Sequence, residues 1–318
     1  MTSSILITGG GGFIGTWVLR ELLARDLRPV VLDVRKNDER WARVIGPAAA
    51  DIPFYAGSLL DRDLLNKIAD EHSISHIIHL AALLTPDCQK NPYAGCELNV
   101  LGSVALFELV RQRAGQIRGF SYASSYAVYG PEADDGTPEV TSNDNKPPSF
   151  YGAFKLAVDM IAEQYWRHFQ IASMGIRPHV VYGPERTVGL TAGPSLAARA
   201  AACGEEYTIN YTGTLGYDYV EDVACGFVRA ALETPPGATV VDLPSQPAST
   251  QDFVKVIEEV VPESAGRLRI EGEPVPANIP PNFHSIAGIF PDWHFTSLTE
   301  GVSRTVEFYR QERVPVSS

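Results

Sequence analysis

The chain has 318 residues, which is long enough for one large α/β domain with a smaller lobe or for two domains. Hydrophobic residues make up 45% of the chain and charged residues 20%, a globular composition that argues against a disordered protein. The 38 acidic residues outnumber the 26 Lys and Arg residues, giving a net charge of −12; because an acidic surface repels the phosphates of nucleic acids and of anionic lipids, neither is an expected partner.

Short apolar runs alternate with helical spacing through the first half of the chain. The apolar runs predict strands at residues 4–8, 29–33, 54–57, 76–80, 119–123 and 172–177. Apolar residues at helical spacing predict helices at residues 13–25, 60–71, 93–113 and 150–169. Strands that alternate with helices in this way predict an α/β fold, in which helices cover both faces of a parallel sheet.

The alternation breaks down after Tyr182, where glycine and proline become frequent and the regular spans shorten. One more strand pair is expected at residues 207–211 and 239–243, followed by a helix at residues 250–261. Residues 271–282 are rich in proline and are not expected to form regular structure. The second half therefore predicts a smaller and less regular unit.

The cysteines point to no metal site. They are Cys88, Cys96, Cys203 and Cys225, and none lies at the spacing of a C-x-x-C pair or a zinc finger. They are interpreted as reduced thiols. No run of about 18 apolar residues is present, so no membrane span is expected. Residues 1–8 open directly into a strand instead of a basic, cleavable leader, and a cytoplasmic location is expected.

A glycine-rich sequence, Thr8-Gly-Gly-Gly-Gly-Phe-Ile-Gly15, follows the first predicted strand and opens the first predicted helix. Glycine is needed where the chain turns tightly, where the backbone approaches a pyrophosphate and where a helix packs closely on a strand. The free N–H groups at the start of the helix would then face the phosphates. A glycine run alone also fits an ordinary turn, but Asp33 ends the next strand, where a carboxylate can bind ribose hydroxyls. Together these features predict a dinucleotide site.

Asp33 also bears on the choice of cofactor. Its charge would repel a 2′-phosphate, which favours NAD over NADP. Arg35 and Lys36 follow at once and would favour the phosphate, unless they belong to an ordinary solvated loop. NAD is the expected cofactor, with NADP as the alternative.

Tyr151 and Lys155 stand four residues apart in the predicted helix 150–169, so their side chains share one face. A tyrosine with a pKa of about 10 is a poor base at neutral pH, and a nearby cation lowers that pKa toward the working range. Tyr151 could then take the proton of a secondary alcohol while a hydride leaves the same carbon. Such pairs also occur on solvated helix faces, so the interpretation depends on the neighbouring motifs.

Two serines, Ser124 and Ser125, follow the predicted strand 119–123 and so lie at the carboxyl edge of the sheet, where ligands bind in such folds. Ser125 is expected to hydrogen-bond the reacting oxygen, with Ser124 in support. A serine pair at this place could instead cap a turn. Its position between the glycine-rich loop and the Tyr151–Lys155 pair favours a catalytic role.

In this order, the motifs resemble those of the extended short-chain dehydrogenase/reductases, the NAD-dependent epimerase/dehydratase family. The resemblance covers nearly the whole chain. The stretches that carry it are Thr8–Gly15, Asp33, His79-Leu-Ala-Ala82, Asn99-Val-Leu-Gly102, Ser124-Ser-Tyr-Ala-Val-Tyr-Gly130, Tyr151-Gly-Ala-Phe-Lys155, and Arg177 with Tyr182-Gly-Pro184. The resemblance implies a Rossmann fold, with a doubly wound parallel sheet and a smaller C-terminal substrate lobe. The NAD-binding domain would span residues 1–183, rejoined by about 218–246, and the substrate lobe would comprise residues 184–217 and 247–318.

The resemblance also implies roles for individual residues. Ser125, Tyr151 and Lys155 would be catalytic. His179 would meet the nicotinamide amide through its backbone, and the two long helices, 93–113 and 150–169, would form a homodimer. The implied cofactor-binding residues are Gly9, Gly12, Phe13, Ile14, Gly15, Asp33, Arg35, Ser58, Leu59, Leu80, Ala81, Ala82, Asn99, Tyr151, Lys155 and His179.

Four positions depart from the family pattern. Gly57-Ser58-Leu59 replaces the usual Gly-Asp, so no acid is available there to contact adenine. Val180 and Leu215 stand where relatives that act on nucleotide sugars usually have Asn and Arg, the residues that meet the substrate diphosphate. Tyr126 follows Ser125 where 4,6-dehydratases have an acid, so dehydration is not expected.

Without the diphosphate ligands, a smaller substrate is expected: a sugar, a sugar acid or a small hydroxy or amino acid that undergoes net dehydrogenation. The alternatives are a UDP-sugar 4-epimerase and a nicotinamide-binding sensor without catalysis, although such a sensor tends to lose the tyrosine or the lysine. Among the candidate contacts, Thr85 and Tyr126 could serve packing only, and Arg186 could be a surface charge. The candidate substrate contacts are Leu84, Thr85, Ser125, Tyr126, Arg186 and Tyr217.

Overall fold

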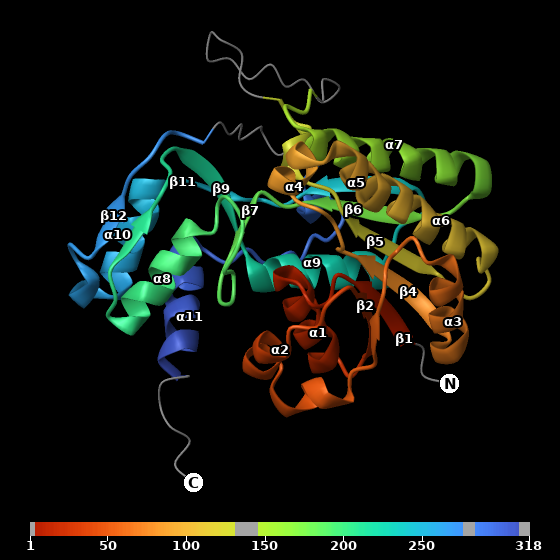
Figure 1. Cartoon of the computed structure of the whole chain (residues 1–318), viewed down its shortest axis with the longest axis horizontal. Coiled ribbons are helices and arrows are strands. Elements are labelled where there is room, and N and C mark those ends of the chain that lie inside the picture. Colours follow the sequence, from red (N-terminus) through yellow and green to blue (C-terminus); the bar gives the residue numbers. More distant parts are fainter. Residues whose placement is uncertain (1–3, 131–145, 276–283, 312–318) are drawn as a thin grey trace.

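A seven-stranded sheet forms the centre of the protein (Figure 1). The computed structural model describes residues 4–130, 146–275 and 284–311. The sheet has the order β10-β6-β5-β4-β1-β2-β3, and all of its strand pairs are parallel. This is the doubly wound α/β arrangement that the sequence predicts. The strands are β1 (Ser4–Thr8), β2 (Arg28–Asp33), β3 (Phe54–Ala56), β4 (Ile74–His79), β5 (Gly119–Ala123), β6 (Ser173–Arg177) and β10 (Ala238–Asp242).

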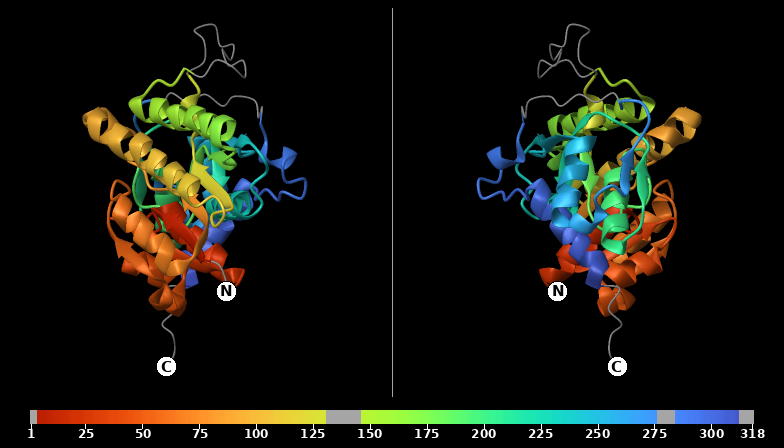
Figure 2. Two further views of the ribbon diagram at one scale, coloured as in Figure 1. Left: turned by 90° about the vertical axis from the view of Figure 1, so that its right-hand side faces the viewer. Right: turned by 90° about the vertical axis from the view of Figure 1, so that its left-hand side faces the viewer.

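Helices cover both faces of this sheet (Figures 1 and 2). Successive side chains of a strand point to opposite faces, and in β1 the side chains of Ile5 and Ile7 pack into one core while Leu6 packs into the other. The first core also contains residues of α1 and α9, and the second contains residues of α3, α6 and α7. The bounds of these helices are α1 (Phe13–Ala24), α3 (Arg62–His72), α6 (Gly102–Gln112), α7 (Phe150–Phe169) and α9 (Val220–Leu232).

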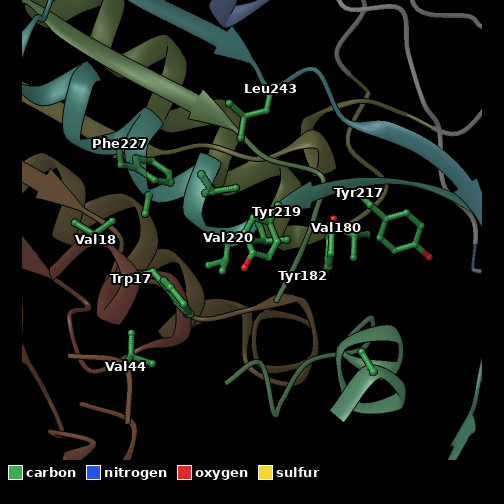
Figure 3. Packing of buried hydrophobic residues seen from close by; sticks show 14 of the residues in the cluster. Trp17, Val18, Val44, Val180, Tyr182, Tyr217, Tyr219, Val220, Phe227 and Leu243 are labelled. Atoms are coloured by element: carbon green, nitrogen blue, oxygen red, sulfur yellow. The ribbon is translucent and has the colours of Figure 1, made fainter. Parts of the chain in front are cut away.

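The second half of the chain adds two small sheets and three helices, which pack on one another. Tyr182 and Tyr217 meet in their core, with ring centroids 6.2 Å apart (Figure 3). Both rings also lie edge-on to Phe253. The sheets are β11-β9-β7 and β12-β8, formed by β7 (Val180–Tyr182), β8 (Tyr207–Ile209), β9 (Thr214–Tyr219), β11 (Gln246–Ser249) and β12 (Leu268–Ile270). The helices are α8 (Gly193–Cys203), α10 (Thr250–Val260) and α11 (Leu298–Gln311).

The expected strand pair at 207–211 and 239–243 is wrong. Both segments contain a strand, but β10 pairs with β6 at the edge of the large sheet and β8 pairs with β12. The reason is that β10 follows α9, a helix that covers the large sheet, so the chain returns directly to that sheet. The predicted division into a cofactor domain and a substrate lobe stays a prediction, and its residues 1–3, 131–145, 276–283 and 312–318 lie outside the described residues.

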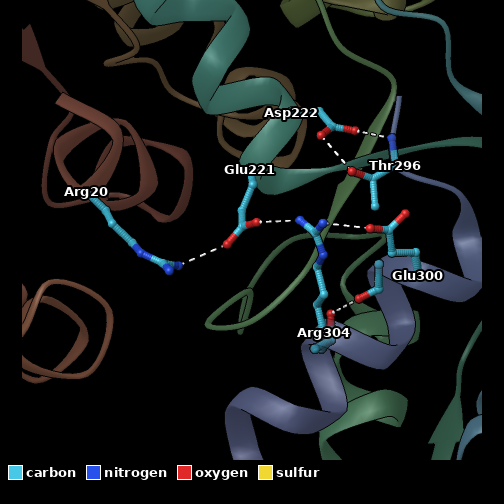
Figure 4. A network of polar contacts seen from close by, with 8 residues as sticks. Arg20, Glu221, Asp222, Thr296, Glu300 and Arg304 are labelled. Atoms are coloured by element: carbon cyan, nitrogen blue, oxygen red, sulfur yellow. Dashed lines mark hydrogen bonds and ion pairs between the residues drawn. The ribbon is translucent and has the colours of Figure 1, made fainter. Parts of the chain in front are cut away.

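Polar contacts join α11 to the helices that cover the large sheet (Figure 4). Glu221 of α9 pairs with Arg20 of α1 at 3.0 Å and with Arg304 of α11 at 2.9 Å. Asp222 accepts hydrogen bonds from both the backbone N–H and the hydroxyl of Thr296, each 2.8 Å long. Since exposed ion pairs contribute at most about 1 kcal/mol each, this network fixes the position of α11 more than it adds stability.

The long helix predicted at 93–113 is continuous over Pro92–Gln112. It consists of α5 (Pro92–Cys96), a π-helical turn at Glu97–Leu101 and α6, and π-helical turns are frequent at functional sites. Among the described helices it alone is long and apolar enough to cross a membrane, with 44% of its apolar window buried in the fold. Core helices of soluble proteins pass the same test, and this one packs on α3 and α7.

Candidate active site

Backbone contacts exclude a side chain at several positions of the glycine-rich loop between β1 and α1, Gly9 and Gly15 among them. Gly9 has a φ of 79°, and a Cβ there would lie 2.7 Å from the backbone nitrogen of Ala81. A Cβ on Gly15 would overlap the carbonyl oxygen of Gly9. Because both obstacles are backbone atoms, they cannot turn away as a side chain would. The loop therefore packs directly against Leu80 and Ala81, which follow β4.

The start of α1 leaves hydrogen-bond donors for a ligand. Gly12 is the N-cap and provides no side-chain cap, and the first turn contains no acidic residue. The N–H groups of Phe13, Ile14 and Gly15 have no acceptor within the helix, as in any helical first turn. Such a group of donors, at the positive end of a helix dipole, fits a pyrophosphate. The dinucleotide site predicted from the sequence thus has the backbone geometry that an NAD pyrophosphate requires.

Asp33 lies at the end of β2, beside this loop. One carboxylate oxygen accepts a hydrogen bond from the N–H of Gly11 at 2.9 Å, and the other accepts one from the N–H of Val34 at 2.7 Å. The N–H of Arg35 lies 3.5 Å from the same oxygen as Val34. Because an ionised carboxylate has about four acceptor positions, Asp33 retains capacity to bind a ribose hydroxyl. The same side chain therefore shapes the loop and suits a ribose.

The two cations after Asp33 differ in their surroundings. Lys36 forms an ion pair with Asp38 at 2.9 Å, and its ammonium lies 4.8 Å from the ring centroid of Trp41. Arg35 is exposed. The ammonium of Lys36 is therefore engaged by Asp38 and Trp41. Of the two cations, this leaves Arg35 to favour a 2′-phosphate, which agrees with NAD as the cofactor.

The other residues predicted to contact the cofactor fall into two groups: the side chains of some contact the protein itself, and others leave their backbone available to a ligand. Leu59 is buried against Gly102, so its side chain belongs to the core. The hydroxyl oxygen of Ser58 accepts a hydrogen bond from the N–H of Leu60 at 3.2 Å. Leu80, Ala81 and Ala82 follow the end of β4 in a half-buried segment without regular structure, where their backbone can line a ligand.

His79 holds this region together, and its contacts were not predicted from the sequence. Its Nδ1 accepts a hydrogen bond from Thr8 Oγ1 at 2.7 Å, and its Nε2–H donates to Ser103 Oγ at 3.0 Å, because the Ser103 hydroxyl itself donates to the carbonyl oxygen of Asn99 at 2.6 Å. Burial lowers the pKa of His79 to about 3, assisted by the charge of Lys155. A neutral histidine thus connects the first residue of the glycine-rich loop to the π-helical turn of Glu97–Leu101.

Asn99 directs its amide to the protein backbone. Its side-chain oxygen accepts a hydrogen bond from the N–H of Leu83 at 2.8 Å, and its side-chain nitrogen donates to the carbonyl oxygen of Leu83 at 2.9 Å. Asn99 is buried. It therefore fixes the segment after β4, and any contribution to cofactor binding through these atoms is indirect.

The three predicted catalytic residues lie together. The hydroxyl of Tyr151 is hydrogen-bonded with Ser125, and Ser125 Oγ also accepts a bond from the N–H of Ala127 at 3.1 Å. The Lys155 ammonium lies 5.6 Å from the centroid of the Tyr151 ring and donates to the carbonyl oxygen of Ala123 at 2.6 Å. The phenol, the hydroxyl and the ammonium thus meet at the carboxyl end of β5, which is the edge expected to bind ligands.

The electrostatics of this group differ from the expectation. Burial raises the pKa of Tyr151 to about 12, although the hydrogen bond from Ser125 lowers it in part. Burial also lowers the pKa of Lys155 to about 8. The expected lowering of the tyrosine pKa by the lysine is therefore not found, because the loss of water on burial dominates the pKa of Tyr151. The phenol is protonated at neutral pH and is ready to donate a proton to a carbonyl oxygen.

A buried polar network supports this group from behind. Asp159, one turn after Lys155, accepts hydrogen bonds from Ser124 at 2.9 Å and from Arg177 at 2.7 Å. Arg177 also donates to the hydroxyl of Tyr129 at 2.8 Å, which in turn donates to Asp242 at 3.0 Å. The network joins β5, α7, β6 and β10. The sequence motifs included Ser124 and Arg177, but neither acid was predicted.

His179 and Tyr126 lie against each other, with ring centroids 4.9 Å apart. The backbone N–H of His179, predicted to meet the nicotinamide amide, donates to Asp218 at 2.6 Å, so its carbonyl is the group left for such a contact. Burial raises the pKa of Asp218 to about 7, and Ser245 donates to its other oxygen at 2.8 Å. Tyr126 is buried, so its ring serves packing.

Among the other candidate substrate contacts, Arg186 and Tyr217 lie close enough to interact electrostatically. Leu84 is exposed, and Thr85 begins the short helix α4 (Thr85–Lys90). Arg186 donates to the carbonyl oxygen of Val181 and to the hydroxyl of Thr191, so its guanidinium shapes its own loop. Tyr217 is buried, and its ring packs edge-on against Phe253 of α10.

Known proteins resemble the chain over most of its length. The family model described as "NAD dependent epimerase/dehydratase family" matches residues 5–241. A UDP-glucose 4-epimerase of Yersinia pestis is 31% identical over 265 residues, which cover 75% of this chain and 77% of that protein.

Solved structures show the same fold at lower identity. UDP-glucose 4-epimerase from Thermus thermophilus, in complex with NAD, superimposes with a TM-score of 0.79 at 23% identity, covering 96% of this chain and 99% of the other. L-threonine dehydrogenase from Phytophthora infestans superimposes with a TM-score of 0.75 at 24% identity, covering 98% of both chains. At these identities the two structures establish the fold alone, and this fold agrees with the Rossmann arrangement expected from the motifs.

Proposed function

Because the chain belongs to the NAD-dependent epimerase/dehydratase family, we propose that it is an NAD-dependent oxidoreductase that acts at a secondary alcohol through Ser125, Tyr151 and Lys155. The observation that carries the proposal is the meeting of these three side chains beside a glycine-rich loop whose geometry fits a pyrophosphate. When bound, the nicotinamide of NAD supplies the acceptor or donor of the hydride.

The three side chains divide the proton chemistry among them. Ser125 donates a hydrogen bond to the reacting oxygen and keeps it within reach of the Tyr151 hydroxyl. In the reducing direction, Tyr151 donates its proton to that oxygen; in the oxidising direction, its phenolate takes the proton of the alcohol. Lys155 donates to the carbonyl oxygen of Ala123, and its ammonium, 5.6 Å from the centroid of the Tyr151 ring, places a positive charge beside the reacting groups.

The proposed substrate is a sugar, a sugar acid or a small hydroxy or amino acid without a nucleotide. The support comes from Val180 and Leu215, which, by the resemblance to the family, stand where nucleotide-sugar relatives usually have the diphosphate ligands. Both are apolar and buried, Leu215 with 1% of its surface exposed, so neither offers a hydrogen-bond donor. A diphosphate would therefore lose its expected partners, whereas a small polyol would not need them.

A 4-epimerase of UDP-sugars is the second candidate, and it is favoured by the similarity to the Yersinia enzyme. A panel of substrates separates the two. Free sugar acids and hydroxy acids should reduce NAD in a spectrophotometric assay if the protein is a dehydrogenase. Conversion of UDP-glucose to UDP-galactose without net reduction, followed by NMR, would reject the dehydrogenase. Tyr151→Phe is the control for either activity.

We also propose a cytoplasmic homodimer, built on the helix Pro92–Gln112 and on α7. Large apolar side chains are exposed on both helices, among them Tyr93, Leu101 and Met160, with 74%, 53% and 61% of their surface accessible. A second copy would cover them. Sedimentation should give the mass of a dimer, and Met160→Glu should shift it to a monomer. A monomeric wild-type protein would contradict the proposal.

A further inference from the structure

The short helix α2 (Asp38–Val44) connects the glycine-rich loop to the segment that follows β7. Arg40 donates from Nη1 to the carbonyl oxygen of Gly11 at 3.1 Å and from Nη2 to the hydroxyl of Thr187 at 3.4 Å. Arg40 is only 8% exposed, so this bridge is shielded from water. One buried guanidinium thus touches both the predicted pyrophosphate loop and residue 187.

A second arginine of the same helix forms a parallel connection. Arg43 pairs with the buried carboxylate of Glu185 at 2.8 Å. Glu185 has a φ of 71°, a left-handed conformation that a non-glycine residue keeps only when its surroundings impose it. Those surroundings include Tyr309 of α11, whose hydroxyl accepts a hydrogen bond from the N–H of Glu185 at 2.7 Å. Residue 185 is therefore held from both sides.

Two tryptophans complete the connection through the backbone. Trp41 of α2 donates from its indole to the carbonyl oxygen of Gly10 at 3.0 Å, and Trp17 of α1 donates to that of Pro184 at 3.1 Å. The carbonyl groups of Gly10 and Gly11 are thus both bound by α2. The charges of Arg40 and Glu185 are complementary. Burial disfavours the cation of Arg40 and lowers its pKa, and the nearby carboxylate of Glu185 acts in the opposite direction.

We propose that Arg40 and Arg43 are positioning residues that couple the binding of NAD in the glycine-rich loop to the ordering of residues 184–187. Arg186, one of the candidate substrate contacts, lies between Glu185 and Thr187, which interact with Arg43 and Arg40 of α2. A dinucleotide bound to the N–H groups of Phe13, Ile14 and Gly15 holds the loop that carries the carbonyl groups of Gly10 and Gly11. Because Trp41 and Arg40 of α2 donate to these carbonyls, binding also restricts α2 and, through Arg40 and Arg43, residues 184–187. The inference rests on the proposed function, because NAD is its ligand.

Hydrogen–deuterium exchange of the full chain, with and without saturating NAD, tests the coupling. In the wild-type protein, NAD should slow exchange both in residues 9–15 and in residues 184–192, the latter by about fivefold or more, a common size for coupling between sites. In Thr187→Val and Glu185→Gln, NAD should still slow exchange in 9–15, while its effect on 184–192 is lost. Arg40→Met tests the contact directly and should give the same result. If Arg40→Met does not fold, Thr187→Val and Glu185→Gln test the proposal in its place.

The control is Lys67→Gln, which removes an exposed ion pair on α3 and should behave as the wild type. A purely structural role would speed exchange of 184–192 equally with and without NAD, and this result would overturn the proposal. Slowing of 9–15 alone in the wild-type protein would overturn it as well. If NAD slows neither segment, the proposed function itself fails, so the two failures are distinguishable.

Discussion

Replacing Lys155 by methionine should remove a pH-dependent part of the stability. Burial lowers the pKa of Lys155 from its ordinary value of 10.5 to about 8. Between these two pH values the unfolded chain binds one proton more than the folded protein, so the free energy of unfolding of the wild type rises with pH. The slope is about 1.4 kcal/mol per pH unit, and the total gain is about 3 kcal/mol. Urea unfolding of the cofactor-free protein between pH 8 and pH 10 measures it.

The slope, and not the absolute stability, is diagnostic for this variant. Lys155→Met also removes the donor to the carbonyl oxygen of Ala123, which costs about 1 kcal/mol at every pH. Lys67→Met, at an exposed site on α3, is the matched control and should keep the wild-type slope. If Lys155→Met keeps it too, the ammonium does not titrate near pH 8 and the argument from desolvation is refuted.

Three further substitutions probe the site. Tyr151→Phe should lower turnover by a factor of about 10² to 10⁴, the usual contribution of a general acid or base, while calorimetry finds NAD affinity close to the wild type; unchanged turnover would reject the catalytic assignment. His79→Asn should abolish a rise in stability with pH of about 1.4 kcal/mol per pH unit between about pH 3 and pH 6.5, since burial lowers the pKa of His79 to about 3; equal slopes in urea unfolding would contradict its neutral role. Asp33→Ala should weaken NAD about tenfold, the loss of charged hydrogen bonds to ribose, and strengthen NADP; a fluorescence titration that finds NAD still preferred to the same extent would argue against it.

The local part of the site was predictable because it depends on short stretches of chain. Gly9 and Gly15 occupy backbone conformations and contacts that other residues cannot adopt, and helical spacing alone places Tyr151 and Lys155 on one face. The alternation of apolar runs likewise predicted the parallel sheet, since such a pattern needs cover on both faces. These features are visible in sequence because each is carried by a short motif or a local repeat of residue types, even where, as for Gly9 and Ala81, the contact itself is with a distant segment.

Contacts between distant segments were decided by the tertiary structure. Local hydrophobicity identified strands at β8 and β10 but not their partners, and the expected pair was wrong. Nothing near Arg40 in the sequence indicates Thr187, and nothing near Asn99 requires that its amide bind Leu83.

Electrostatic environment is the other property that sequence could not supply. A lysine four residues from a tyrosine predicts a lowered tyrosine pKa, yet in the folded protein the pKa of Tyr151 rises to about 12. Desolvation is the cause, and it depends on every group that excludes water around the phenol. The sequence by itself determined the residue types, their order along the chain and the sheet edge at which they gather. Only the packing of β5, α7 and the polar network behind them decided how strongly each group holds its proton.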